Sequence, residues 1–229
     1  MISIFEQAMG EEFTKLHPKM QKRFGVNSGS LVAQMGKGVM DEIWRGPFFI
    51  MPFLAFGAFR SILFPMWRKR NTDVPFTISN YAYVDGLGRE TVTISRRFRL
   101  PHRVRSFDAN MIYSKKRKKV IDYIGTHQHL AVDIDLSVDE VGGLCLRAGE
   151  QRFYEHKLAF RFPFFLTGQA NVREWWDENE EKYRIEVRIT NKLLGNVFGY
   201  RGSFTVQEVS NRAVDIPLEV RPFREEVRD

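Results

Sequence analysis

The chain has 229 residues, of which 43% are hydrophobic and 28% are charged, with a formal net charge of +7. This balance is typical of a globular protein, and it excludes a disordered, collagen-like or coiled-coil chain. All-β barrels and sandwiches often use this length as one domain, so we expect a single domain over residues 1–229. Cys145 is the lone cysteine, which favours a reducing compartment. The first residues lack the features of a signal peptide, and we expect a cytoplasmic protein.

Two short helices are expected in residues 1–30, where they would brace a larger structure. Ser3 and Glu6 form a capping-box pair at the start of the first helix. Pro18 suits the first position of the second helix, and Gly25 suits the residue that follows its end.

Residues 38–70 are expected to hold a first strand at 38–45 and then the most apolar segment of the chain. Prolines and a glycine interrupt this segment, which argues against a membrane-spanning helix. We favour an apolar helical segment at 47–66 that lies as a lid across one end of a sheet. The alternative is peripheral contact with a membrane, because aromatic side chains precede a cationic run. The residues of that contact would be Phe49, Phe53, Phe56, Phe59, Trp67, Arg68, Lys69 and Arg70.

Residues 75–209 show a succession of strand patterns separated by short turns. The clearest runs from Leu130 to Val138, where apolar and polar residues alternate. No helical pattern separates the strands, which argues against parallel βαβ units. We therefore expect a mainly β fold, an antiparallel up-and-down meander of about ten strands that closes into a calycin- or lipocalin-like barrel, with a sandwich as the alternative. Residues 210–229 are expected to form an edge or a loose tail.

The string GTHQHLAVD contains the clearest candidate for a metal site. It places His127 and His129 two residues apart on one face of a strand, where they could chelate a metal ion, with Asp133 further along, similar to the first half of a cupin site. No second half follows, so we favour a polar or solvent-facing histidine pair and predict no metal. Asp122 and Tyr123 lie shortly before and could belong to the same cluster.

Two further strings place arginines on strands. GEQRFYE puts Glu150, Arg152 and Tyr154 on one strand face, and FGYRGSF contains Arg201. Arginine can bind a carboxylate or phosphate head group through two hydrogen bonds. The alternative, which we favour, is a cross-strand ion pair between Glu150 and an arginine. The chain has no nucleophile elbow, no phosphate-binding glycine loop and no CxxC motif, so we predict no cofactor.

Several strings, among them GRETVTISRRF, DYIGTHQHLAVDIDLSV and FGYRGSF, resemble an uncharacterised bacterial domain family described only as a domain of unknown function. The resemblance runs from Ile4 to Val209. It implies that relatives occur alone, fused to nicotinamide-binding domains similar to saccharopine dehydrogenase, or with membrane proteins. It implies no catalytic residues.

The leading functional hypothesis is a non-enzymatic binding module whose barrel holds a small apolar or lipid-like molecule. The second is an enzyme that uses histidine and carboxylate groups, and the third is an anionic-membrane or nucleic-acid interaction domain. Nucleic acid is the weaker partner, because the basic run at 115–119 suits a solvated hairpin tip. The candidate ligand-binding residues are His127, His129, Glu150, Arg152, Tyr154, Arg201, Asp122 and Tyr113. The candidate lining residues are Met111, Tyr113, Phe160, Phe162, Trp175 and Trp176.

Overall fold

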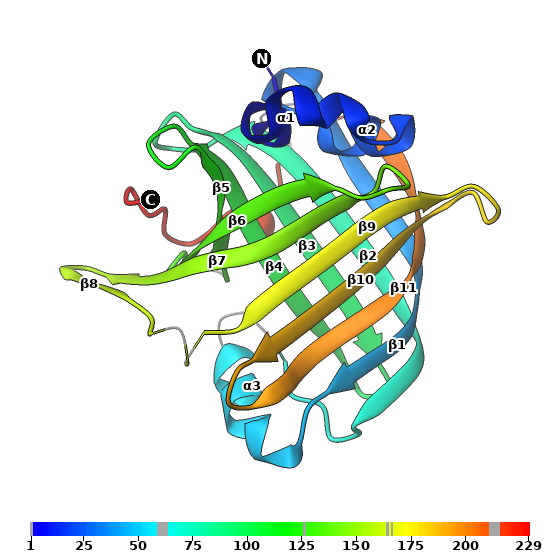
Figure 1. Cartoon of the computed structure of the whole chain (residues 1–229), viewed down its shortest axis with the longest axis vertical. Coiled ribbons are helices and arrows are strands. Elements are labelled where there is room, and N and C mark those ends of the chain that lie inside the picture. The colour runs from blue at the N-terminus through cyan, green and yellow to red at the C-terminus, as the bar shows by residue number, and fades with distance from the viewer. Residues whose placement is uncertain (1, 59–63, 126, 164, 166, 211–215) are drawn as a thin grey trace.

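The fold is a closed antiparallel β-barrel with short helices at both ends (Figure 1). The computed structural model describes residues 2–58, 64–125, 127–163, 165, 167–210 and 216–229, with the side chains of residues 53, 56–58 and 219 also left out. The helices are α1 (Ile4–Met9), α2 (Pro18–Phe24) and α3 (Met51–Ala58). The strands are β1 (Val32–Arg45), β2 (Arg70–Val84), β3 (Glu90–Leu100), β4 (Arg103–Ser114), β5 (Lys119–Ile124), β6 (Leu130–Val138), β7 (Leu144–Glu155), β8 (Leu158–Arg161), β9 (Gln169–Asp177), β10 (Lys182–Asn191) and β11 (Gly195–Ser210).

Ten of the strands in the described residues form the ring. They follow the order β6-β5-β4-β3-β2-β1-β11-β10-β9-β7, and a further pairing of β6 with β7 closes the circle. β8 pairs with the end of β7 and lies outside the ring. The predicted mainly β fold and its closure into a barrel are therefore confirmed. Closure gives every strand of the ring a neighbour on both sides, with the shortest pairing between Leu144–Arg147 of β7 and Asn171–Glu174 of β9.

β1 begins at Val32, earlier than the predicted start at residue 38. Glycines weaken the strand pattern in this stretch, and the structure shows why they are needed. A Cβ on Gly38 would collide with the carbonyl oxygen of Ser203 on β11, and a Cβ on Gly36 would collide with the side chain of Ile78 on β2. The glycines thus allow neighbouring strands and side chains to approach closely.

One side of the barrel interior is filled with aromatic rings. Phe98 lies at the centre of this group, with its ring centroid 5.1 Å from Phe76 and 5.0 Å from Tyr200. Phe64 joins the group from the segment after α3, 5.2 Å from Phe98. The facing wall, from β4 to β7 and from β9 and β10, carries smaller aliphatic side chains such as Val132, Ala148, Ala170 and Val172. This unequal filling leaves a hollow on the aliphatic side.

Helices cover the two ends of the barrel, as Figure 1 shows. α1 begins as predicted, with the Glu6 amide donating to the Ser3 hydroxyl at 3.1 Å. At the opposite end, Ile50 and Leu54 of the apolar segment are fully buried in the barrel core. None of the helices in the described part of the chain is long and apolar enough to cross a bilayer.

The C-terminal residues 216–229 differ from the expected loose tail, because they pack on the outer wall of the barrel. Ile216 is buried beside Tyr83, and the Tyr123 hydroxyl donates to the Arg228 carbonyl oxygen at 2.8 Å. Tyr123 belongs to a buried cluster on the outward face of the strands, with Ile112, Ile121, Ala131 and Tyr154. An outward apolar patch therefore gives the polar tail a surface to cover, which the tail sequence alone does not reveal.

The backbone of Glu226 ties the tail to the barrel, because its amide donates to the Gln128 side-chain oxygen at 2.7 Å and its carbonyl oxygen accepts from Arg89 at 2.8 Å. The ionisation of its carboxylate supplies a first prediction. Burial raises its pKa, but hydrogen bonds from Arg228 and the charges of Arg228 and Arg224 outweigh burial and hold the pKa at about 2. A depressed carboxyl pKa gives stability that is present above the ordinary value and is lost as pH falls through the folded-state value. We expect Glu226→Gln to lower the free energy of unfolding by about 2 kcal/mol at neutral pH.

Urea denaturation from neutral pH down to about pH 3 measures this effect, and the difference between variant and wild type should shrink as the pH falls. The control is Glu225→Gln, which makes the same change at the neighbouring tail residue. The Glu225 carboxylate accepts a hydrogen bond from the Gly86 amide at 3.2 Å. Equal losses in the two variants would show that Glu226 has no special role.

Candidate functional site inside the barrel

A cavity of about 180 Å³ lies inside the barrel, where the aliphatic wall faces the aromatic rings. Most of its lining is apolar and comes from strands on several sides of the ring. Six polar or charged side chains also border it: Arg23, Arg96, Asp122, Gln151, Glu174 and Tyr200. The cavity therefore combines an apolar body with a few polar groups, as small-molecule sites do.

The first polar pair in the cavity wall joins α2 to the barrel. The Arg23 guanidinium forms an ion pair with the Glu174 carboxylate of β9, and the two side chains are 1% and 5% exposed. Arg23 also donates to the Gln34 side-chain oxygen at 3.3 Å and lies 5.0 Å from the Phe204 ring centroid. These partners compensate for the burial of both charges, so we assign this pair a structural role at the helical end.

A second polar group, formed by Arg96, Asp122 and Tyr200, is not satisfied in this way. These residues lie on β3, β5 and β11, and they are 7%, 8% and 0% exposed. Among the described residues, no hydrogen-bond partner meets Arg96 Nε, Asp122 Oδ1 or the Tyr200 hydroxyl. The Arg96 guanidinium lies 5.1 Å from the Phe107 ring centroid. A buried polar atom without a partner costs about 1–3 kcal/mol, so three of them in one cavity call for an explanation.

Burial also changes the protonation of this group. Burial raises the pKa of Asp122 to about 7, although the Arg96 charge and the Asn110 backbone oppose the rise. Burial raises the pKa of Tyr200 as well, and Glu174 adds to the rise while Arg96 opposes it. Near neutral pH, Asp122 is therefore poised between a hydrogen-bond donor and an anion, whereas Tyr200 stays a neutral phenol.

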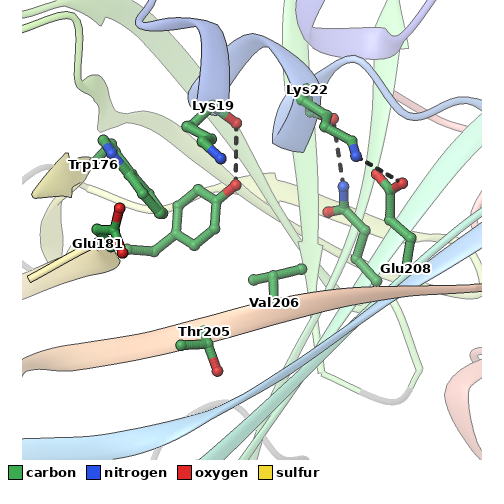
Figure 2. A pocket seen from close by; sticks show the side chains of 9 residues that line it. Lys19, Lys22, Trp176, Glu181, Thr205, Val206 and Glu208 are labelled. Carbon is green, nitrogen blue, oxygen red and sulfur yellow. Dashed lines mark hydrogen bonds and ion pairs between the residues drawn. The ribbon is translucent and has the colours of Figure 1, made fainter. Parts of the chain in front are cut away.

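A second, shallower pocket of about 210 Å³ lies where α2 meets the barrel rim, and Figure 2 shows its side chains. The Tyr183 hydroxyl donates to the Lys19 carbonyl oxygen at 3.2 Å, and the Lys22 ammonium lies 3.0 Å from a Glu208 carboxylate oxygen. The Lys19 ammonium lies 4.9 Å from the Trp176 ring centroid. These polar groups are partnered, so we interpret this pocket as the seam that holds α2 on the barrel.

Asp122 is the one sequence-predicted site residue that lines the cavity in the described part of the chain. Tyr113 on β4 is half-buried against the core but lies outside the cavity lining. Of the expected lining residues, Met111 lines the cavity and Trp176 lines the α2 seam. Phe160 is 42% exposed on β8, which lies outside the ring, and Phe162 contacts its ring. Trp175 stacks under Arg173, with 4.3 Å between guanidinium and ring centroid.

The two histidines lie in the connection between β5 and β6 rather than on a strand. Their rings stack with centroids 5.4 Å apart. Gln128 between them has a φ of 52°, a left-handed conformation that breaks the strand pattern. His129 Nδ1 lies 2.7 Å from a Glu155 carboxylate oxygen. No group of three metal-ligating side chains occurs among the described residues.

The other predicted polar residues lie on the outer wall, where they pair with one another. One Arg152 nitrogen contacts Glu150 at 2.9 Å and Asp133 at 2.8 Å, and Arg152 Nε donates to the Tyr154 hydroxyl at 3.1 Å. Glu150 forms a cross-strand ion pair with Arg161 of β8 at 2.9 Å, and Arg117 in the turn between β4 and β5 also contacts it at 3.1 Å. On β11, the half-exposed Arg201 side chain lies 3.4 Å from Glu42.

Sequence reasoning missed Arg96 and Tyr200, although a signal for each was present. Arg96 follows Val92 and Ile94 at two-residue spacing, so it occupies the apolar row of its strand. Tyr200 stands two residues after Phe198 in the same way. An arginine within an inward-facing row marks a buried charge, and this is the pattern that would have revealed the site.

The fold and cavity define a class of closed, helix-capped antiparallel barrel with a partly polar interior. The chain belongs to a family whose model is described as "Domain of unknown function (DUF4166)", and the match covers residues 16–204. The chain is 31% identical over 208 residues to "Uncharacterized protein YndH" of Bacillus subtilis (strain 168), covering 91% of this chain and 98% of that protein. No solved structure matches the chain.

The pKa of Asp122 supplies a second prediction. The native carboxyl group holds its proton up to about pH 7, but the unfolded one releases it near pH 4, so native stability falls as pH rises between these values. The amide that replaces this carboxyl group in Asp122→Asn cannot titrate. We expect the stability of Asp122→Asn relative to wild type to rise by up to about 4 kcal/mol from pH 4 to pH 8.

Urea denaturation of both proteins across this pH range tests the prediction. Asp135→Asn is the control, because the Asp135 side chain is 54% exposed and pairs with Lys119 on the surface. A stability difference for Asp122→Asn that stays constant with pH would mean that Asp122 titrates normally.

Proposed function

We propose that this protein is a non-enzymatic binding module whose barrel holds a compact apolar molecule with one oxygen-bearing polar group. The observation that carries this proposal is the meeting of an apolar cavity with three buried polar atoms that lack partners, on Arg96, Asp122 and Tyr200. A ligand that supplied those partners would remove their desolvation cost, and the cavity walls would cover its apolar part.

The polar group of the ligand follows from the donors in the cavity. Arg96 always donates hydrogen bonds, the neutral Tyr200 hydroxyl donates one, and Asp122 donates one when protonated. Three donors favour an acceptor oxygen, so a carboxylate or a ketone is the best match. A bound carboxylate would pair with Arg96 and raise the pKa of Asp122 further, because two negative charges share the site. Carboxylate binding would then be accompanied by proton uptake.

The size of the ligand follows from the cavity volume. A water needs about 10–15 Å³ of such volume, so 180 Å³ offers room for roughly a dozen water-sized groups. This favours a molecule of about ten non-hydrogen atoms, such as octanoate, over a long-chain lipid. The resemblance implies relatives that accompany nicotinamide-binding domains or membrane proteins, and a carrier of small oxygenated compounds would suit both settings.

A second candidate function, an enzyme, is favoured by the pKa of Asp122. A carboxyl group that titrates near pH 7 suits acid–base catalysis. His127, His129 and Glu150 lie outside the cavity lining, so Asp122 would act with Arg96 and Tyr200. Mass spectrometry of octanoate and octan-2-one after incubation separates the two candidates, since a product formed by the wild type and not by Asp122→Asn would favour the enzyme.

Calorimetric titration with straight-chain carboxylates from butyrate to palmitate tests the binding module. We expect affinity near pH 6 to rise up to octanoate and then to stop rising, because the cavity is full. Arg96→Met should weaken octanoate binding by at least about tenfold, since a charge-assisted hydrogen bond contributes about 1.5–3 kcal/mol. Affinity for octanoate should also fall as pH rises above 7, where Asp122 ionises.

Two tyrosine variants form a matched pair for this titration. Tyr200→Phe removes a hydroxyl inside the cavity and should weaken octanoate binding. Tyr183→Phe removes a hydroxyl that donates to Lys19 at the α2 seam, outside the cavity lining, and should leave binding unchanged. If octanoate and octan-2-one both fail to bind, or if Arg96→Met binds octanoate as well as the wild type does, the proposed function is wrong.

A further inference from the structure

The end of the barrel that carries α3 has an unusual composition. In an up-and-down barrel, alternate connections follow the same ends of the strands, so the connection that contains α3 has four others on its side, one of which holds β8 and projects to the side of the barrel (Figure 1). We call the five connections together the α3 end; they are 46–69, 101–102, 125–129, 156–168 and 192–194.

The α3 end is basic and contains no acidic residue in its sequence. Its lysines and arginines are Arg60, Arg68, Lys69, Lys157, Arg161 and Lys192. The connections at the opposite end mix both signs, because their basic residues are accompanied by Asp85, Asp139, Glu140, Glu178, Glu180 and Glu181. The molecule therefore presents one end that is suited to an anionic surface.

Large apolar side chains are exposed at this same end. Trp67 is 78% exposed, Phe48 is 62% exposed and Phe49 is 58% exposed. The buried Arg45 fixes the backbone at Trp67, because its guanidinium donates to the carbonyl oxygens of Met66 at 2.7 Å and Trp67 at 2.9 Å, and it lies 5.5 Å from the Phe48 ring centroid. The rings of Phe48 and Trp67 lie 6.5 Å apart. The exposed rings are thus displayed by a fixed backbone, and their grouping marks an interaction surface.

A hollow of about 690 Å³ separates the apolar segment from the turn between β3 and β4. Arg68, Arg103 and Arg105 border it, and the structure gives them no ion-pair partner among the described residues. Arg70 differs, because it pairs with Glu42 at 2.8 Å. Of the aromatic residues expected to contact a membrane, Phe59 lies outside the described residues, as do the side chains of Phe53 and Phe56.

We propose that the α3 end docks on the surface of an anionic lipid bilayer. The rings of Phe48, Phe49 and Trp67 enter the head-group layer, while Arg68 and Lys69 attract anionic lipids. Charge complementarity supports this partner, because Arg68 and Lys69 have no ion-pair partner among the described residues and the α3 end contains no carboxylate in its sequence. A bilayer fits better than a nucleic acid, since the exposed set includes the aliphatic Leu193, 72% exposed, which gains nothing from base stacking.

Sedimentation of the full chain with lipid vesicles tests the proposal. We expect the protein to pellet with phosphatidylcholine vesicles that contain about 30% phosphatidylserine and to stay in solution with phosphatidylcholine alone. Raising salt from about 0.1 M to about 0.5 M should weaken binding, because screening increases. Arg68→Glu with Lys69→Glu should weaken it by at least about 25-fold, taking about fivefold for each cation lost. Trp67→Ala should weaken it as well.

Two control variants separate a local effect from a general one. Lys115→Glu with Lys116→Glu makes the same charge change at exposed residues of the opposite end. Leu218→Ala removes an apolar side chain that is 84% exposed outside the α3 end. We expect both controls to bind vesicles like the wild type. Equal weakening in the two charge variants, equal binding to both lipid mixtures, or binding of an oligonucleotide without binding of vesicles would overturn the proposal.

This inference does not rest on the interior cavity. The α3-end variants should retain octanoate binding, and Arg96→Met should retain vesicle binding. If the protein binds octanoate but not anionic vesicles, the docking proposal fails and the proposed function stands. If it binds the vesicles but not octanoate, the proposed function fails and the docking proposal stands.

Discussion

Pairing of β6 with β7 is the constraint on which the rest of this structure depends. Without it the strands would form an open curved sheet with two free edges, and water would reach every inward-facing side chain. With it, and with α2 and α3 over the ends (Figure 1), the inward-facing core side chains are buried. Enclosure lowers the local dielectric constant, and this makes Arg96, Asp122 and Tyr200 costly to bury and raises the pKa of Asp122 to about 7.

The buried polar groups of the barrel are of two kinds, those with partners among the described residues and those without. We assign the first kind a structural role and the second kind a role in ligand binding. Arg23 and Glu174 are buried but matched, and they tie a helix to the sheet. On the outer wall, Glu150 forms ion pairs with Arg152 and with Arg161 of β8, although Arg152 Nη2 has no hydrogen-bond partner in the described part of the chain. The group around Arg96 is buried and unmatched, which is why we place ligand binding there. At the α3 end, the rings of Phe48, Phe49 and Trp67 and the side chains of Arg68 and Lys69 are exposed and belong to neither kind.

Sequence reasoning reached the architecture because strand alternation and short turns are local signals. It could not predict which face of each strand points into the barrel, and the inward-facing residues are the ones that line the cavity. The register between β6 and β7 shifts where β7 has one residue more than β6, between Ala148 and Gln151, so the residues of β7 after this bulge change faces relative to the simple alternation. The pairing of Glu150 with arginines was foreseen as the simpler alternative, whereas Arg96 and Tyr200 were hidden among apolar neighbours. The packing of the tail depends on a distant patch around Tyr123, which no local pattern encodes.

The central claim is that the closed barrel keeps a buried polar group that lacks partners among the described residues and binds a small oxygenated ligand. The most direct test is nuclear magnetic resonance of the Asp122 side-chain carboxyl carbon, titrated with acid and base in the free protein and with octanoate. We predict a midpoint of about 7 in the free protein and a higher midpoint with octanoate bound. A midpoint near the ordinary value of 3.8, unchanged by octanoate, would show that water reaches the group and would contradict the account.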